Sequence, residues 1–153
     1  MKSRLILAIC TLVVICPKSD WAQAPAPPID RTPLARPKPI CAKAEPDAAK
    51  VMRDLVSMAT MAGFSPREQN TADGTLEAWK MDAPNSENSD RVVIWIERDL
   101  NRPANMIQIY LSFGRYMKII AAACDICRVV VNDNEEQRRV GPLKQLVVNY
   151  CVS

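Results

Sequence analysis

Apolar residues recur at steps of three and four between residues 46 and 62, which predicts an amphipathic helix. Pro46 suits the first helical position, Asp47 favours the positive N-terminal end, and Gly63 supplies a stop. We expect this helix to pack its apolar face into a core. Methionine at this spacing is more typical of core packing than of an adaptable binding surface. The face consists of Val51, Met52, Leu55, Met58, Ala59 and Ala62.

The middle of the chain is typical of β-strands. Residues 75–81 and 91–97 are short runs rich in β-forming side chains, and residues 84–90 between them are a polar turn cluster. Residues 106–113 alternate between apolar and polar side chains, which predicts a strand with one buried face. That face consists of Ile107, Ile109, Leu111 and Phe113.

The segment after this strand has an ambiguous period. Gly114-Arg115 fits a two-residue hairpin turn with glycine first, from which residues 116–123 would return as another strand. The shortness of that turn favours a strand, although Met117, Ile120, Ala121 and Cys124 also match a helix face.

The C-terminal part predicts an extended piece at residues 128–131 and then a helix. Asp133 and Glu136 resemble a capping box, and Pro142 can start a final helix that ends near Tyr150. The whole pattern predicts an α+β fold: an N-terminal helix packed on an antiparallel meander of about four strands, followed by a short C-terminal helix.

Residues 1–24 have the layout of a cleaved signal peptide. Lys2 and Arg4 precede an apolar run at residues 5–16, and Ala22-Gln23-Ala24 supplies small residues before a cut. Twelve helical residues rise about 18 Å, whereas the hydrocarbon core of a membrane is about 30 Å thick. The sequence therefore predicts an exported protein, periplasmic or secreted, without a transmembrane span after cleavage. Pro25 disfavours cleavage directly after Ala24, so the cut can shift.

Lipid anchoring is the alternative to a plain signal peptide. Cys10 and Cys16 each follow an isoleucine rather than the small residue that lipoprotein processing requires. The sequence therefore disfavours a lipid-anchored form.

Residues 25–43 predict an extended linker ahead of a single domain at residues 44–153. Six prolines between residues 25 and 39 exclude helix and central strand and favour a polyproline-type arm. A spacer explains the segment better than a docking peptide, because the prolines follow no repeat. About 110 residues then remain, enough for one core and too few for two.

Charge and composition exclude several classes of function. Residues 1–24 hold three basic side chains and one acidic one, so the net charge of +3 falls to +1 without them. This balance gives no electrostatic footprint for nucleic acid. The chain has no histidine, which excludes Ser-His-Asp and Cys-His catalysis and imidazole-bound zinc.

Four cysteines remain after cleavage: Cys41, Cys124, Cys127 and Cys151. An even number in an exported chain of this size predicts two disulfides. We favour one bridge from each flanking cysteine, Cys41 and Cys151, to the Cys124–Cys127 region. The alternative pairs the two flanking cysteines with each other and closes Cys124–Cys127 as a tight loop.

Cys124-Asp125-Ile126-Cys127 is also the one motif with potential redox chemistry. Asp125 between the thiols opposes formation of the thiolate that exchange requires, although Arg128 partly offsets it. A structural disulfide is therefore the preferred interpretation. Thiol–disulfide exchange is the alternative, and a four-cysteine zinc site would require a second close pair.

Carboxylates offer a further hypothesis, because a glycan-cleaving enzyme needs only two of them. Glu97 and Asp99 follow a strand, and Glu135 and Glu136 lie near a helix start. A solvated strand end and a capped helix account for them without catalysis.

The sequence thus favours a non-enzymatic, exported binding or accessory module for a protein or a cell-envelope component. It predicts no catalytic residue, no cofactor and no metal site. Apolar surface around Trp79 or Trp95 would support partner binding. A thiol-redox protein is the first alternative and a carboxylate-dependent hydrolase the second.

Overall fold

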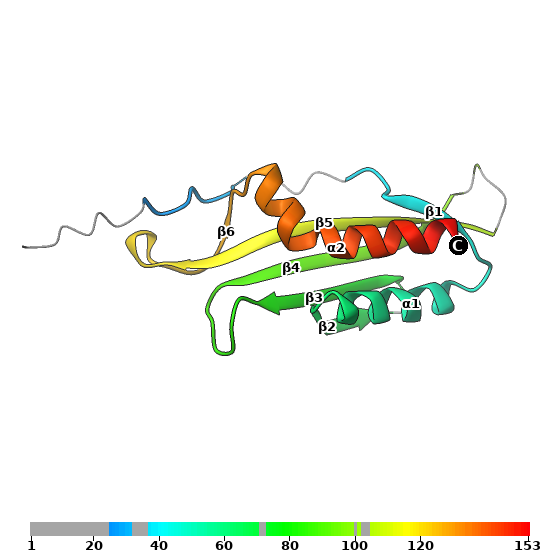
Figure 1. The fold of residues 1–153 in the computed structure, drawn as a ribbon, viewed down its shortest axis with the longest axis horizontal. Helices are drawn as coiled ribbons and strands as arrows, with labels where there is room; N and C mark the ends of the chain where they lie inside the picture. Colours follow the sequence, from blue (N-terminus) through cyan, green and yellow to red (C-terminus); the bar gives the residue numbers. More distant parts are fainter. Residues whose placement is uncertain (1–24, 32–36, 71–72, 100, 102–104) are drawn as a thin grey trace, which may run out of the picture.

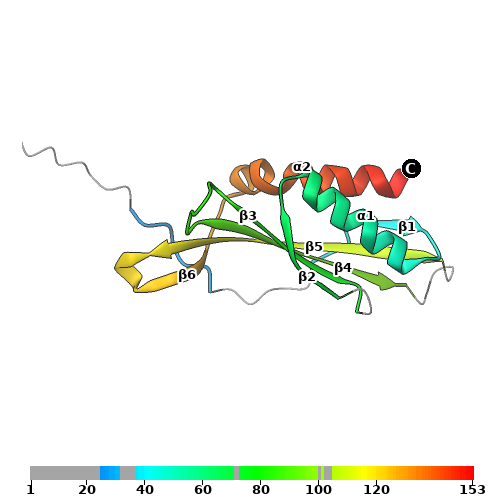
Figure 2. The same ribbon diagram turned by 90° about the horizontal axis from the view of Figure 1, so that it is seen from below.

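The protein consists of one six-stranded antiparallel sheet with two helices on one of its faces (Figures 1 and 2). The structure is a computed structural model that describes residues 25–31, 37–70, 73–99, 101 and 105–153. The predicted signal peptide, residues 1–24, lies outside the described residues. The α+β class predicted from sequence is confirmed at this level.

The strands are connected mainly as a meander. Their order in the sheet is β1-β5-β4-β3-β2, and β6 pairs with the other half of β5 from the same side as β1. The bounds are β1 Cys41–Ala44, β2 Ser65–Asn70, β3 Thr75–Met81, β4 Ser89–Arg98, β5 Met106–Ile119 and β6 Cys124–Val129. The prediction of about four strands is therefore wrong in number.

Helix α1, Ala48–Met61, confirms the predicted N-terminal helix, although Pro46 lies before the N-cap rather than at the first helical position. Asp47 is its N-cap, and the carboxylate accepts hydrogen bonds from the backbone N–H groups of Ala49 and Lys50 at 2.9 and 3.2 Å. Gly63, with φ of 84°, turns the chain out of the helix in a conformation that favours glycine. The buried face is Val51, Met52, Leu55, Met58 and Ala59, as the periodicity indicated.

The core lies between the helices and the inward side of the sheet. Alternate residues of the three longest strands point into it: Leu76, Ala78, Val92, Ile94, Ile107, Ile109 and Leu111. Helix α2 adds Val140, Leu143 and Val147. This alternation leaves the other face of the sheet without a helix, and it is called the open face below (Figure 2).

The predicted hairpin turn at Gly114-Arg115 is wrong. Strand β5 continues through both residues, with Gly114 opposite Arg91 and Arg115 opposite Asp90 in the β4 ladder. The chain reverses later, in a 3-10 turn at Ile120–Ala122 followed by Ala123 in the left-handed region. A strand can contain Arg115 at a buried position because its charge is neutralised by acids from the neighbouring elements.

The consequence is that residues 116–123 form neither a returning strand nor a helix. Residues 116–119 end β5, and the strand that returns is β6, which begins earlier than the extended piece predicted at 128–131.

The polar turn cluster was predicted to extend to residue 90, but β4 already begins at Ser89. Asp90 belongs to this strand and is buried.

Helix α2, Asp133–Val152, is longer than the predicted C-terminal helix. Its N-cap is Asn132, whose side chain accepts from the N–H of Glu135 at 2.9 Å, rather than the predicted box of Asp133 and Glu136. Pro142 lies inside the helix instead of at its start. The helix bends part-way along its length (Figure 1), as expected where proline removes a backbone hydrogen bond.

Edge strands β6 and β2 have features that discourage strand addition. Residues 28–30 of the Pro-rich segment lie along β6, where the N–H groups of Val130 and Asp30 donate to Pro28 and Arg128 carbonyls at 3.0 and 2.8 Å. Edge strand β2 contains Pro66 and an irregular register at Arg67.

The linker role assigned to residues 25–43 stays a prediction, although β1 begins within that range.

Candidate functional site

The four cysteines form the pairing that the sequence did not favour. Cys41 is bonded to Cys151, and Cys124 is bonded to Cys127. The preferred connectivity, flank to centre, is therefore wrong. The first bond joins β1 to the last turn of α2, where Lys43 Nζ also donates to the Tyr150 carbonyl at 2.7 Å. That bond fastens the C-terminal helix to an edge strand.

The Cys124–Cys127 bond lies at the start of β6, after the 3-10 turn. Cys127 is buried in a small apolar cluster with Ile119 and Val129, whereas Asp125 between the two sulfurs is exposed. A redox pair requires a thiolate stabilised by a helix N-terminus or a cation. The surroundings of this pair are a strand and an acid, which favours a structural bond.

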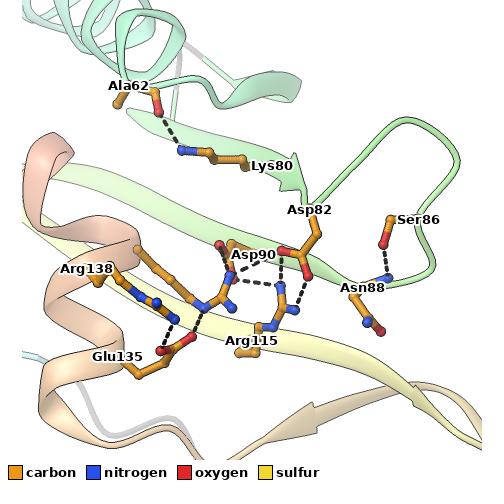
Figure 3. A network of polar contacts seen from close by, with 10 residues as sticks. Ala62, Lys80, Asp82, Ser86, Asn88, Asp90, Arg115, Glu135 and Arg138 are labelled. Atoms are coloured by element: carbon orange, nitrogen blue, oxygen red, sulfur yellow. Dashed lines mark hydrogen bonds and ion pairs between the residues drawn. The ribbon is translucent and has the colours of Figure 1, made fainter.

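A partly buried network of ion pairs connects the end of β3, the start of β4, the middle of β5 and α2 (Figure 3). Arg115, from β5, has a side chain 4% exposed and donates to Asp82 at 2.8 Å and to Asp90 at 3.2 Å. Arg139, from α2, reaches the same two carboxylates at 3.2 and 3.3 Å and also pairs with Glu135. The network therefore connects the sheet to the N-terminal half of α2.

Arginines of the network stabilise the ionised form of two of its carboxylates. The hydrogen bond from Arg115 lowers the pKa of Asp82 below its ordinary value. The hydrogen bond from Arg139 does the same to the pKa of Glu135. A general acid in a glycosidase requires a raised pKa. A cavity of about 260 Å³ adjoins the network, lined by Lys80, Met81, Asp82, Asp90, Arg138 and Arg139.

The carboxylates singled out from sequence lie in different places. Glu135 belongs to the network just described, and Glu136 accepts from Lys144 at 2.7 Å within the same helix. Glu97 lies in β4, and Asp99 just after it accepts from Gln108 at 2.8 Å. Arginine, lysine and amide groups thus hold Glu135, Glu136 and Asp99, which favours a structural role for these three carboxylates.

Aromatic side chains are concentrated on the open face. Of the five Trp and Tyr residues in the described part of the chain, Trp79, Trp95, Tyr110 and Tyr116 lie there, and Tyr150 lies in α2. Trp95 and Tyr110 stack with 5.4 Å between ring centroids, and Trp79 and Tyr116 lie tilted with centroids 5.3 Å apart. Register places these two pairs on either side of Val93 and Ser112.

Polar groups hold both aromatic pairs in place. Glu77 accepts from the indole N–H of Trp79 and from Arg91, each at 2.6 Å. The Arg91 hydrogen bond is the main reason that the pKa of Glu77 is lowered. Tyr110 donates to Gln108 at 2.6 Å, which in turn donates to Asp99. The rings are thus held in fixed positions before any partner binds.

Arginines lie over and beside the indole of Trp79. The guanidinium carbons of Arg67 and Arg91 lie 5.1 and 5.6 Å from its ring centroid, within cation–π range. A shallow hollow next to them is lined in part by Arg91, Val93, Ser112, Gly114 and Tyr116. Sequence reasoning named Trp79 and Trp95 but gave no role to Tyr110, which the alternation of residues 106–113 places outward, and missed Tyr116 because of the predicted turn at Gly114-Arg115.

No family model matches the chain, and no curated protein matches it in sequence. Among the described residues, no helix is both long and apolar enough to cross a membrane.

Proposed function

We propose that the mature chain is an exported, non-enzymatic binding module whose open face holds a protein or a cell-envelope component. The observation that carries the proposal is the placement of Trp79, Trp95 and Tyr116 on a sheet face that no helix covers, with Tyr110 buried beside Trp95. Tyr, Trp and Arg are the residue types most enriched in binding surfaces and their energetic centres. Their fixed hydrogen-bond partners reduce the entropy lost on binding.

Compartment and chemistry support the same proposal. The signal-peptide pattern and two cysteine pairs at bonding distance fit an oxidising, exported environment. The absence of histidine from the sequence and the lowered pKa values of Glu77, Asp82 and Glu135 fit a role without acid–base catalysis. The redox alternative rests on Cys124–Cys127 alone, whose setting favours a structural bond.

Tryptophan emission tests the proposal directly. Trp79 and Trp95 are the two tryptophans of residues 25–153, and both lie on the open face. We expect their emission to shift to shorter wavelength when the mature protein is titrated with an envelope component. Soluble peptidoglycan fragments are one probe, and vesicles of phosphatidylethanolamine and phosphatidylglycerol are the other.

A matched pair of variants locates the surface. Val93→Asp places a charge between the aromatic pairs, whereas Met61→Asp places the same charge on α1, where Met61 is 72% exposed. Val93→Asp should abolish the response and Met61→Asp should preserve it, with circular dichroism confirming that both fold. Equal loss in both variants, or no response to either probe, would contradict the proposal.

A further inference from the structure

The hairpin of β5 and β6 extends past the rest of the sheet. The β4–β5 ladder ends where Ser89 lies opposite Tyr116, whereas β5 continues to Ile119 and the chain returns as β6. In the described part of the chain, the strand pairing of residues 117–127 therefore stays within this hairpin. Figures 1 and 2 show its turn, in yellow, at the end of the molecule opposite the C-terminus. Residues 120–126 are called the hairpin tip below.

The hairpin tip presents apolar side chains that the fold does not use. Ile120 is 85% exposed and Ile126 is 69% exposed. The three alanines at residues 121–123 are exposed as well, and residues 119–124 form a run without a polar side chain. Side chains so exposed contribute little to folding stability, because they stay in contact with water. Exposed apolar side chains that are grouped in this way indicate a contact surface.

Two features below the tip hold it in shape. Cys127 packs with Ile119 and Val129 in a small apolar cluster, and the Cys124–Cys127 bond constrains the chain directly after the turn. A two-stranded hairpin is only marginally stable in water by itself. The cluster and the disulfide therefore keep the apolar side chains in position before anything binds, which lowers the entropy lost on binding.

Charged side chains near the tip compensate one another. Lys118, directly before the apolar run, donates to Glu87 at 2.8 Å, and this hydrogen bond is the main reason that the pKa of Lys118 is raised. Asp125 is exposed on the returning strand and adds a smaller effect in the same direction. Arg128, farther along β6, pairs with Asp30 at 3.1 Å. These groups leave no excess of positive charge, so attraction to an anionic partner does not explain the tip.

The shape of the tip decides which kind of partner fits it. Two strands about 4.8 Å apart give an end roughly 10 Å across, or about 100 Å² in cross-section. A standard protein interface buries about 800 Å² on each partner, which a narrow convex end does not provide. A lipid bilayer has no fixed shape to match, and apolar side chains leave water when they enter its surface.

We propose that the hairpin tip inserts into the surface of a lipid bilayer, with Ile120 and Ile126 at the boundary between headgroups and acyl chains. Asp125 is costly to bury in hydrocarbon and limits insertion to this depth. Lys118 lies where its long side chain can reach the headgroup layer. Apolar burial rather than charge drives the insertion. The tip is a different surface from the open face, so this inference does not depend on the proposed function.

Vesicle flotation with matched variants tests the insertion. The disulfide-intact mature protein should float with phosphatidylcholine vesicles, weakly and reversibly, and should stay bound at about 0.5 M salt because no charge attraction is needed. Ile120→Asp and Ile126→Asp should each lower the vesicle partition coefficient about tenfold or more. Met61→Asp is the matched control, since Met61 on α1 is 72% exposed, and it should change nothing.

Quenching by brominated lipids reports insertion without relying on a loss of binding. Ile120→Trp adds a fluorophore at the tip, whose emission should fall when the vesicles contain phospholipids brominated on their acyl chains. Met61→Trp should show no such added quenching. Absence of flotation, binding that salt abolishes, or equal quenching of the two added tryptophans would overturn the proposal. Flotation that Val93→Asp abolishes and Ile120→Asp preserves would also overturn it, and would assign the lipid contact to the open face.

Discussion

Arg115 donates to Asp90 directly across the β4–β5 ladder, with 3.2 Å between Arg115 Nη1 and Asp90 Oδ1. Both side chains are almost wholly buried, at 4% and 3% exposed. The pair lies on the helix side of the sheet, where the neighbouring residues of both strands are apolar. Each charge is tolerated because opposite charges surround it: Arg115 also pairs with Asp82, and Asp90 also pairs with Arg139.

Removal of one partner should be strongly destabilising. We expect Arg115→Met to lower the free energy of unfolding by about 3 kcal/mol, because Asp90 loses its nearest guanidinium in a buried site. Arg138→Met is the matched control: its side chain is 72% exposed, so the loss should stay within about 0.5 kcal/mol. Urea denaturation measures both.

The double variant Arg115→Met/Asp90→Leu provides the sharper test. It should be more stable than Arg115→Met alone, because no uncompensated charge remains at the position. Additive losses would show that the pair is not energetically coupled.

The two disulfides should differ in their contribution to stability. Cys41–Cys151 closes a loop of 110 residues, whereas Cys124–Cys127 spans only three. In the chain-entropy model the long loop is worth about 4 to 5 kcal/mol and the short one about half of that or less. We expect Cys41→Ser/Cys151→Ser to lower the urea midpoint much more than Cys124→Ser/Cys127→Ser. Similar losses from the two double variants would contradict this order.

Stability should fall in acid through the carboxylates that arginines hold. The folded-state pKa values of Glu77 and Asp82 are lowered, mainly by hydrogen bonds from Arg91 and Arg115. A lowered folded pKa means that the contribution is present above the ordinary carboxyl pKa, about 4, and is lost as pH falls through the folded value. The urea midpoint should therefore be steady from about pH 7 to 5 and fall below about pH 4.

Substitution of these carboxylates checks the origin of the acid sensitivity. Asp82→Asn and Glu77→Gln should each lower the midpoint near neutral pH and reduce its further fall in acid, because the titrating group is gone. Variants that show the wild-type pH dependence would assign the effect to other groups.

Local patterns predicted the elements that depend on near neighbours in the chain. Helix α1 followed from its apolar face, its N-terminal Asp47 and its terminal glycine, all within 20 residues. Strand β3 was predicted with its observed bounds. Strands β1 and β2 have little pattern of their own: one has four residues and the other is polar with a proline. Their pairing partners make them strands.

The tertiary structure decided what depends on distant partners. Gly114-Arg115 is typical of a turn when read locally, but the carboxylates of Asp82 and Asp90 neutralise Arg115 within a continuous strand. Cys41 meets Cys151 because β1 lies beside β5, under the end of α2.

The sequence by itself determined the α+β class, the predicted export signal and the exclusion of histidine chemistry. These depend on composition and short-range periodicity, which are properties of neighbouring residues. Only the tertiary structure decided the disulfide pairing, the buried ion network and the gathering of four aromatic rings on one face. Each of these depends on strand register between residues far apart in the chain, and no local pattern contains that register.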